Sequence, residues 1–163
     1  MPKNYWENVI FSQFLLSIDD CTLSEMGDYD IQFQLNNLTM RAIADFKFPQ
    51  IPLEYNFEEN TDEEGEKVRK YYFENKITQR EVNVILARMK QYWIEYQISQ
   101  EELFNNLYFD KDIRTFSPGN TIDKLIKMLT TFRRAAERVE LDYHRVAVDG
   151  TPGIGDINVY CLW

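Results

Sequence analysis

From Ile122 onward, apolar residues recur at alternating steps of three and four without a break. The set is Ile122, Leu125, Leu129, Phe132, Ala136, Val139, Tyr143 and Val146. Such a seam forms one continuous stripe along an α-helix and packs against a partner helix. At about 1.5 Å per residue this helix would be on the order of 37 Å long, at least the diameter of a small domain. The seam therefore predicts a mainly α fold, a helical bundle with a long C-terminal helix.

The same segment carries basic residues on the side opposite the seam. At about 100° per residue they fall into one stripe, interrupted mainly by Asp142. We call this set the basic stripe; it consists of Lys124, Lys127, Arg134, Arg138 and Arg145. A solvated helix face is its simplest interpretation, and a contact with an acidic surface is the alternative.

Two further segments have helical periodicity. Residues 5–18 place four apolar side chains at intervals of four, which marks one face of a helix. Thr78 and Glu81 have the spacing of a capping box, and apolar residues follow at threes and fours as far as Tyr96. Ser99 and Glu102 repeat this spacing and predict a separate, shorter helix through about residue 107, followed by a turn at residues 117–120.

Residues 29–48 fit two structures. A helical stripe runs through Ile31, Leu35, Leu38, Ala42 and Phe46, whereas strand-like alternation near residue 31 fits a hairpin that turns at Asn36 and Asn37. The helix is favoured because residues 38–48 are mostly good helix formers and Pro49 provides a stop.

Extended structure is predicted at two places, about residues 51–57 and 157–163. In the first, Leu53, Tyr55 and Phe57 alternate with polar residues, which suits a sheet edge. The acidic residues 58–66 that follow contain no apolar side chain and are predicted to be a solvated loop, with an interaction epitope as the alternative. Residues 149–155 are rich in glycine and lead into the apolar C-terminus. We therefore expect one helical domain over residues 1–148 and a C-terminal tail for contact between subunits over residues 149–163.

Size and composition exclude several classes of protein. A chain of 163 residues with 44% hydrophobic residues is the size of one domain and too apolar to be disordered. Its apolar runs are too short to span a bilayer, and the first twenty residues lack the pattern of a secretory signal. Cys21, Cys161 and His144 are too few for an all-Cys/His zinc site. Two cysteines favour a reducing compartment, and a single disulfide between the two ends of the chain is the alternative.

Charge is distributed unevenly along the chain. Residues 1–66 contain three basic and fourteen acidic residues, whereas residues 67–163 contain fifteen basic and thirteen acidic ones. Duplex DNA attracts proteins mainly through phosphate neutralisation, which a net charge of -9 opposes. Specific nucleic-acid binding is therefore not expected.

Candidate chemical groups have simpler explanations. The loop at residues 149–156 lacks the lysine or helix start that phosphate loops use, and a turn explains it. His144 reads as a surface or satisfied side chain, and the acid pairs at residues 19–20 and 101–102 read as helix-end residues. We predict no catalytic, cofactor-binding or metal-binding residue, and hence no enzyme.

Three stretches together resemble a group of tailed-bacteriophage virion proteins. They are residues 41–50 (RAIADFKFPQ), 73–97 (FENKITQREVNVILARMKQYWIEYQ) and 109–119 (FDKDIRTFSPG), which lead into the long C-terminal helix. The likeness spans about residues 30–145 and is one of layout, without a short diagnostic motif. Proteins of that group lie in the neck between portal and tail, as ring or head–tail adaptor subunits.

The resemblance implies a non-enzymatic, mostly helical virion subunit, assembled in the host cytoplasm. It implies contacts with copies of itself in a ring, often of twelve, and with portal and other neck or tail proteins, around a conduit for DNA. A ring contact joins two different surfaces of one chain, and the acidic first part and the basic stripe can supply them. The expected interface residues are Leu53, Tyr55, Phe57, Arg134, Arg138, Tyr160, Leu162 and Trp163. The alternative is a soluble acidic helical module that binds or inhibits a basic partner protein.

Overall fold

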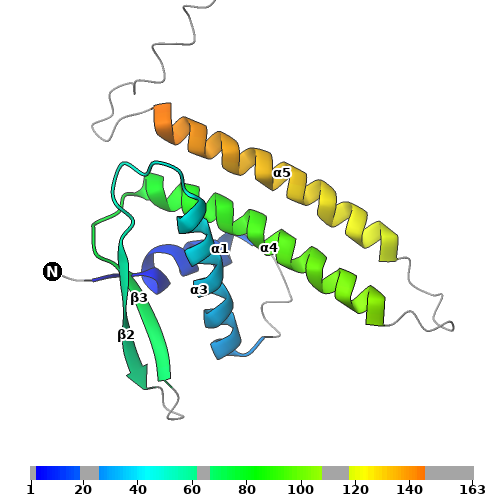
Figure 1. Ribbon diagram of the computed structural model, residues 1–163, viewed down its shortest axis with the longest axis horizontal. Helices are drawn as coiled ribbons and strands as arrows, with labels where there is room; N and C mark the ends of the chain where they lie inside the picture. Colours follow the sequence, from blue (N-terminus) through cyan, green and yellow to red (C-terminus); the bar gives the residue numbers. More distant parts are fainter. Residues whose placement is uncertain (1–2, 19–25, 62–66, 108–117, 146–163) are drawn as a thin grey trace, which may run out of the picture.

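A computed structural model describes residues 3–18, 26–61, 67–107 and 118–145 of the chain (Figure 1). The fold is mainly α, as predicted, with one small antiparallel sheet. In chain order the elements are β1 (Asn4–Tyr5), the π-helical turn η1 (Glu7–Phe11), α1 (Ser12–Ser17), α3 (Asp28–Asp45), β2 (Tyr55–Thr61), β3 (Lys67–Phe73), α4 (Gln79–Leu107) and α5 (Pro118–Arg145).

The long C-terminal helix is confirmed. Figure 1 shows α5 lying along α4 over most of its length, and these two helices make the most extensive contact in the fold. Ala136 and Tyr143 of the predicted seam are buried, and Leu125, Leu129, Phe132 and Val139 pack beside the core. Val146, the last seam residue, lies outside the described residues. The seam thus serves the pairing of α5 with α4.

Residues 28–45 form helix α3, so the predicted helix is confirmed and the hairpin alternative is wrong. The helical period brings Leu35, Leu38, Thr39 and Ala42 to one buried face, which packs against α4. The helix ends at Asp45, four residues before Pro49, where the Phe46 N–H donates to the Ile43 carbonyl.

The capping box at the start of α4 is present, but the predicted second box is not. The Thr78 N–H donates to Glu81 Oε2 at 2.9 Å, and Thr78 Oγ1 accepts from the Arg80 N–H. Ser99 lies inside α4, where its hydroxyl donates to the Glu95 carbonyl of the preceding turn. The separate helix after Ser99 was therefore wrong, because an i−4 hydrogen bond satisfies the hydroxyl inside one continuous helix.

The turn predicted at residues 117–120 was also wrong at residues 118–120, because these three residues form the start of α5. Proline is tolerated at the first position of a helix because the first N–H groups have no partner within the helix.

The sheet has the order β1–β3–β2, with all neighbours antiparallel. The predicted edge strand is β2, which begins at Tyr55 and continues to Thr61, so residues 58–61 are strand and not the predicted loop. Cross-strand charge explains the extension, because Glu58 lies opposite Lys70 and Glu59 opposite Arg69. Residues 62–66 of the predicted loop lie outside the described residues.

The core lies where α4 meets the other helices and one face of the sheet. Trp6, directly before η1, Ile10 of η1 and Phe14 of α1 enter it. Helices α3 and α5 cover two sides of α4 (Figure 1). The largest fully buried side chains include Trp6, Trp93, Phe14, Ile10, Ile85 and Met89.

Candidate interaction surfaces

The predicted interface residues of the extended segment separate into two kinds. Leu53 is buried and belongs to the core cluster, so its side chain is not free for a partner. Tyr55 and Phe57 are 40% and 42% exposed, and Trp6 and Tyr71 pack against parts of their rings. The exposed part of this predicted contact is therefore confined to Tyr55 and Phe57.

Strand β2 has a free edge within the described part of the chain. Its one strand neighbour is β3, and the Glu74 N–H donates to the Glu54 carbonyl at the start of the pair. Because antiparallel pairs alternate, the backbone groups of residues 55, 57, 59 and 61 then point away from β3. The Phe57 N–H is bound by the Asn56 side chain at 2.9 Å. The other outward groups can accept an added strand.

The basic stripe lies in solvent. All five of its side chains are exposed, and Arg145 pairs with Asp142 at 3.2 Å. Lys124, Lys127, Arg134 and Arg138 have no ion-pair partner among the described residues. By contrast, Arg133 on the flank of α5 pairs with Glu95 of α4. Apart from Arg145, the stripe is thus a positive surface along α5 without ion-pair partners among the described residues.

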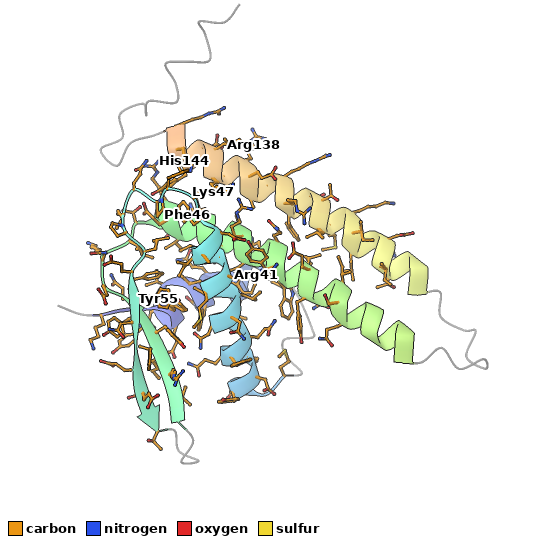
Figure 2. All side chains as sticks on the ribbon, in the orientation of Figure 1. Arg41, Phe46, Lys47, Tyr55, Arg138 and His144 are labelled. Atoms are coloured by element: carbon orange, nitrogen blue, oxygen red, sulfur yellow. The ribbon has the colours of Figure 1, made fainter. Side chains whose placement is uncertain are left out.

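A loop that sequence reasoning missed is held against the end of α5. We define the Phe48 loop as residues 46–50. The Lys47 N–H donates to Glu140 Oε1 at 3.0 Å, and the Gln50 N–H donates to the Tyr143 hydroxyl at 2.6 Å. Between these anchors, Phe48 has a φ of 52° and its side chain is 83% exposed. Figure 2 shows Phe46 and Lys47 beside the end of α5 that carries Arg138 and His144.

A buried polar network holds this end of the fold together. The Tyr143 hydroxyl donates to Glu81 Oε1 at 2.7 Å, and Arg88 forms an ion pair with Glu140. Burial has the largest effect on the pKa of Glu81 and opposes ionisation. Hydrogen bonds from Thr78 and Tyr143 nevertheless hold this pKa below its ordinary value. Burial, followed by the hydrogen bond to Glu81, raises the pKa of Tyr143 to about 12.

This pKa shift predicts a loss of stability at high pH. Unfolded Tyr143 ionises near its ordinary pKa of 10.0, whereas folded Tyr143 stays neutral to about pH 12. The contribution of neutral Tyr143 to the free energy of unfolding is therefore complete below pH 10. It falls by about 2 to 3 kcal/mol as the pH rises to 12. Urea unfolding at pH 9, 10 and 11 should show a steeper fall for the native protein than for Tyr143→Phe. Parallel pH profiles for the two proteins would contradict this assignment.

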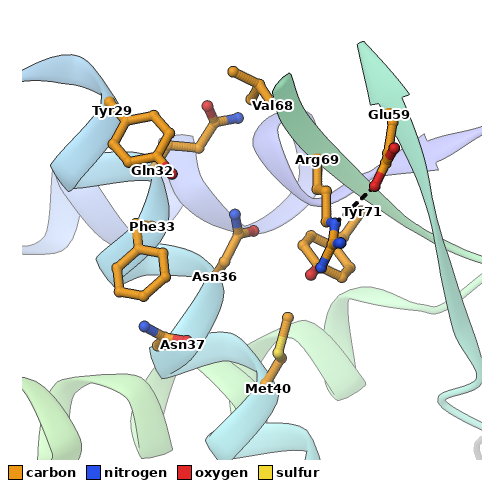
Figure 3. A pocket seen from close by; sticks show the side chains of 10 residues that line it. All are labelled: Tyr29, Gln32, Phe33, Asn36, Asn37, Met40, Glu59, Val68, Arg69 and Tyr71. Atoms are coloured by element: carbon orange, nitrogen blue, oxygen red, sulfur yellow. Dashed lines mark hydrogen bonds and ion pairs between the residues drawn. The ribbon is translucent and has the colours of Figure 1, made fainter. Parts of the chain in front are cut away.

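A pocket of about 280 Å³ lies between α3 and the β2–β3 hairpin, and we call it the α3 pocket (Figure 3). Helix α3 contributes one wall and the two strands the other. Figure 3 shows Arg69 and Glu59 joined on the strand side, at a distance of 3.2 Å. The lining residues are Tyr29, Gln32, Phe33, Asn36, Asn37, Met40, Glu59, Val68, Arg69 and Tyr71.

Of the remaining residues singled out in the sequence, His144 is the one whose side chain lies in the described part of the chain. His144 is half-buried, with its ring edge-on to Tyr143 at a centroid distance of 5.3 Å. Several candidates lie outside the described residues: both cysteines, the acid pair at 19–20, the 149–156 loop and the tail residues Tyr160, Leu162 and Trp163. The side chains of residues 101–102 are not described either. In the described ranges, no group of three or more His, Cys, Asp or Glu residues is arranged to hold a metal ion. No helix in these ranges combines the length and apolar character that crossing a membrane requires.

Comparison of the chain with protein-family models, with curated proteins and with solved structures returns no match. Function is therefore inferred from the surfaces themselves.

Proposed function

We propose that this protein is a non-enzymatic structural subunit that assembles head-to-tail into a ring. Specifically, we assign it the role of a head–tail adaptor in the neck of a tailed bacteriophage, between portal and tail and around the DNA conduit. The layout that resembles neck proteins and the exposed surfaces of the fold both support this assignment.

The observation that carries the proposal is a separation of unpaired charges on the surface. Arg134 and Arg138 of α5 are exposed and have no ion-pair partner among the described residues. Asp28 and Asp30, in the first turn of α3, are exposed and equally without a counterion in those ranges. Opposite charges on different parts of one chain attract the corresponding parts of neighbouring copies, which is the requirement of a heterologous contact.

The free edge of β2 supports the same role. An apolar segment such as residues 157–163 of a neighbouring copy can add to this edge as a further strand. The added strand would satisfy outward backbone groups and cover Tyr55 and Phe57. Because β2 itself is acidic, pairing of two β2 edges would place like charges together, which favours a different strand as the partner.

The native mass of the purified protein tests the proposal. We expect oligomers that grow with concentration, and stable complexes with portal rings, measured by light scattering and native mass spectrometry. The double variant Arg134→Glu/Arg138→Glu should raise the apparent dissociation constant at least tenfold, because it turns attraction into repulsion. Lys76→Glu, an exposed charge reversal outside the stripe, is the matched control and should assemble normally.

Two outcomes would overturn the assignment. One is a protein that stays monomeric at all concentrations and ignores portal rings. The other is a salt-sensitive one-to-one complex with a basic protein, without self-association, which would favour an acidic binding or inhibitor module.

A further inference from the structure

Strand β2 leaves backbone groups and two half-exposed rings uncovered on its outer side. In the described part of the chain, the N–H and C=O groups of Tyr55 and Glu59 point away from β3 and have no strand opposite them. The rings of Tyr55 and Phe57 lie on the face of the sheet that packs against Trp6 and Tyr71, and they are 40% and 42% exposed. An edge of this kind promotes aggregation unless another segment covers it.

The acidic side chains of β2 are already paired inside the fold. Glu58 pairs with Lys3, and Glu59 pairs with Arg69 at 3.2 Å. The outward N–H of Phe57 is bound by the preceding side chain, which an incoming strand must displace. A segment that fits this edge therefore needs no charge of its own and should offer apolar side chains to the two rings.

Residues 157–163 of the chain have this chemistry. The segment contains no charged side chain. Alternate residues of an extended segment share one face. On one such face of residues 157–163 all side chains are apolar: Ile157, Val159, Cys161 and Trp163. Added to β2 with this face toward the helices, the segment would cover the exposed parts of Tyr55 and Phe57.

The chain is long enough to bring this segment to the β2 edge of its own subunit. Helix α5 ends beside the loop that leads into β2, because the Tyr143 hydroxyl accepts the Gln50 N–H at 2.6 Å, five residues before β2 begins. Figure 1 shows the end of α5 on the same side of the fold as the start of β2. Five residues span at most about 18 Å, whereas the eleven residues 146–156 span up to about 36 Å.

We propose that residues 157–163 add to the β2 edge of their own subunit in the free protein and so close it. A short connection gives an attached segment an effective concentration on the order of millimolar. In dilute protein the segment therefore meets its own edge more often than the edge of another copy. Assembly into a ring would then exchange the same strand between copies, which is domain swapping. The closure goes beyond the proposed function, because it holds even for a subunit that never assembles.

Amide hydrogen exchange in dilute protein, followed by NMR, tests the closure. Val159→Asp places a carboxylate on the apolar face of the segment, and Asn158→Asp, the matched control, places one on its other face. The outward N–H groups of Tyr55 and Glu59 should exchange at least tenfold faster in Val159→Asp than in the native protein or the control. The Glu58 N–H, which points toward β3, should exchange equally slowly in all three proteins and so report an intact hairpin.

A spin label on Cys161, in a Cys21→Ser background, shows which copy supplies the strand. In one sample the spin label and nitrogen-15 are on the same chain. In the other, a spin-labelled chain is mixed with a separate chain that carries nitrogen-15. We expect the amide signals of β2 to broaden in the first sample and not in the second.

The outcomes separate this inference from the proposed function. Equal exchange rates in the native protein and Val159→Asp, or no broadening in either sample, overturn the closure. Equal broadening in the two samples overturns closure within one subunit and leaves strand exchange between copies, and with it the proposed function, standing. Broadening within one chain, in a protein that stays monomeric at every concentration and ignores portal rings, keeps the closure and overturns the proposed function.

Discussion

Replacing Trp6 with alanine is expected to lower the free energy of unfolding by about 3 to 5 kcal/mol, the usual cost of removing a fully buried large aromatic side chain. Trp6 is completely buried, and its ring stacks on Tyr71 with centroids 4.9 Å apart. It also contacts the rings of Tyr55 and Phe73 at 5.0 and 5.7 Å. One residue near the N-terminus therefore holds both long strands of the sheet against the helices. Urea unfolding, followed by far-ultraviolet circular dichroism, measures the change.

The matched control for Trp6 is Leu16→Ala in the same N-terminal region. Leu16 is 90% exposed, and its truncation should change stability by no more than about 0.5 kcal/mol. Trp6→Phe should be milder than Trp6→Ala, because an aromatic ring remains and the buried Nε1–H, which has no acceptor among the described residues, is removed. A loss below 1 kcal/mol in Trp6→Ala would show that the sheet stays attached without this side chain.

Replacing Arg88 with methionine is expected to cost about 3 to 5 kcal/mol, because it leaves the carboxylate of Glu140 buried without its counterion. The side chains of Arg88 and Glu140 are 14% and 9% exposed, and they connect α4 to α5. Glu140 also accepts the Lys47 N–H, so this change should loosen the Phe48 loop as well. Thermal and urea unfolding measure the first effect, and hydrogen exchange of residues 46–50 measures the second.

A second ion pair across the same two helices provides the control. Arg133 of α5 pairs with Glu95 of α4, but more than half of the Arg133 side chain is in solvent and Glu95 keeps Arg41 as a partner. Arg133→Met should therefore cost less than about 1 kcal/mol. The double variant Arg88→Met/Glu140→Leu should recover much of the loss, because no unpaired charge then stays buried. If Arg88→Met and Arg133→Met lowered the free energy of unfolding equally, burial would not be the reason why the Arg88–Glu140 pair matters more.

Periodicity was sufficient for the helices whose apolar faces are continuous. The seam of α5, the capping box at Thr78 and the stripe through Leu35 and Leu38 all predict elements that the structure contains. The predictions that were wrong rested on a few neighbouring residues, whose local preference is outweighed by the longer helix around them. Ser99 has the spacing of a helix start, yet α4 continues through it because its hydroxyl bonds the preceding turn.

Strand β3 shows why the sheet was harder to predict. Residues 67–73 mix basic and aromatic side chains without clean alternation, and they form a strand because β2 pairs with them along all seven residues. The same pairing converts residues 58–61 from a predicted acidic loop into strand. The energy of such pairs depends on residues far apart in the chain, so no local window contains it.

By itself the amino-acid sequence determined that the chain has a mainly helical fold with a long, basic-faced C-terminal helix. The reason is that the apolar repeat of a helix connects residues only three or four positions apart in the chain. Only the tertiary structure decided that Leu53 is core, that β2 is an edge strand of the three-stranded sheet in the described part of the chain, and that Phe48 projects from a strained loop. Those features come from contacts between residues distant in sequence. The hydrogen bonds that orient Phe48 join positions 93 residues apart. The exposure of Phe48 follows from these long-range bonds to α5 and not from its neighbours in the chain.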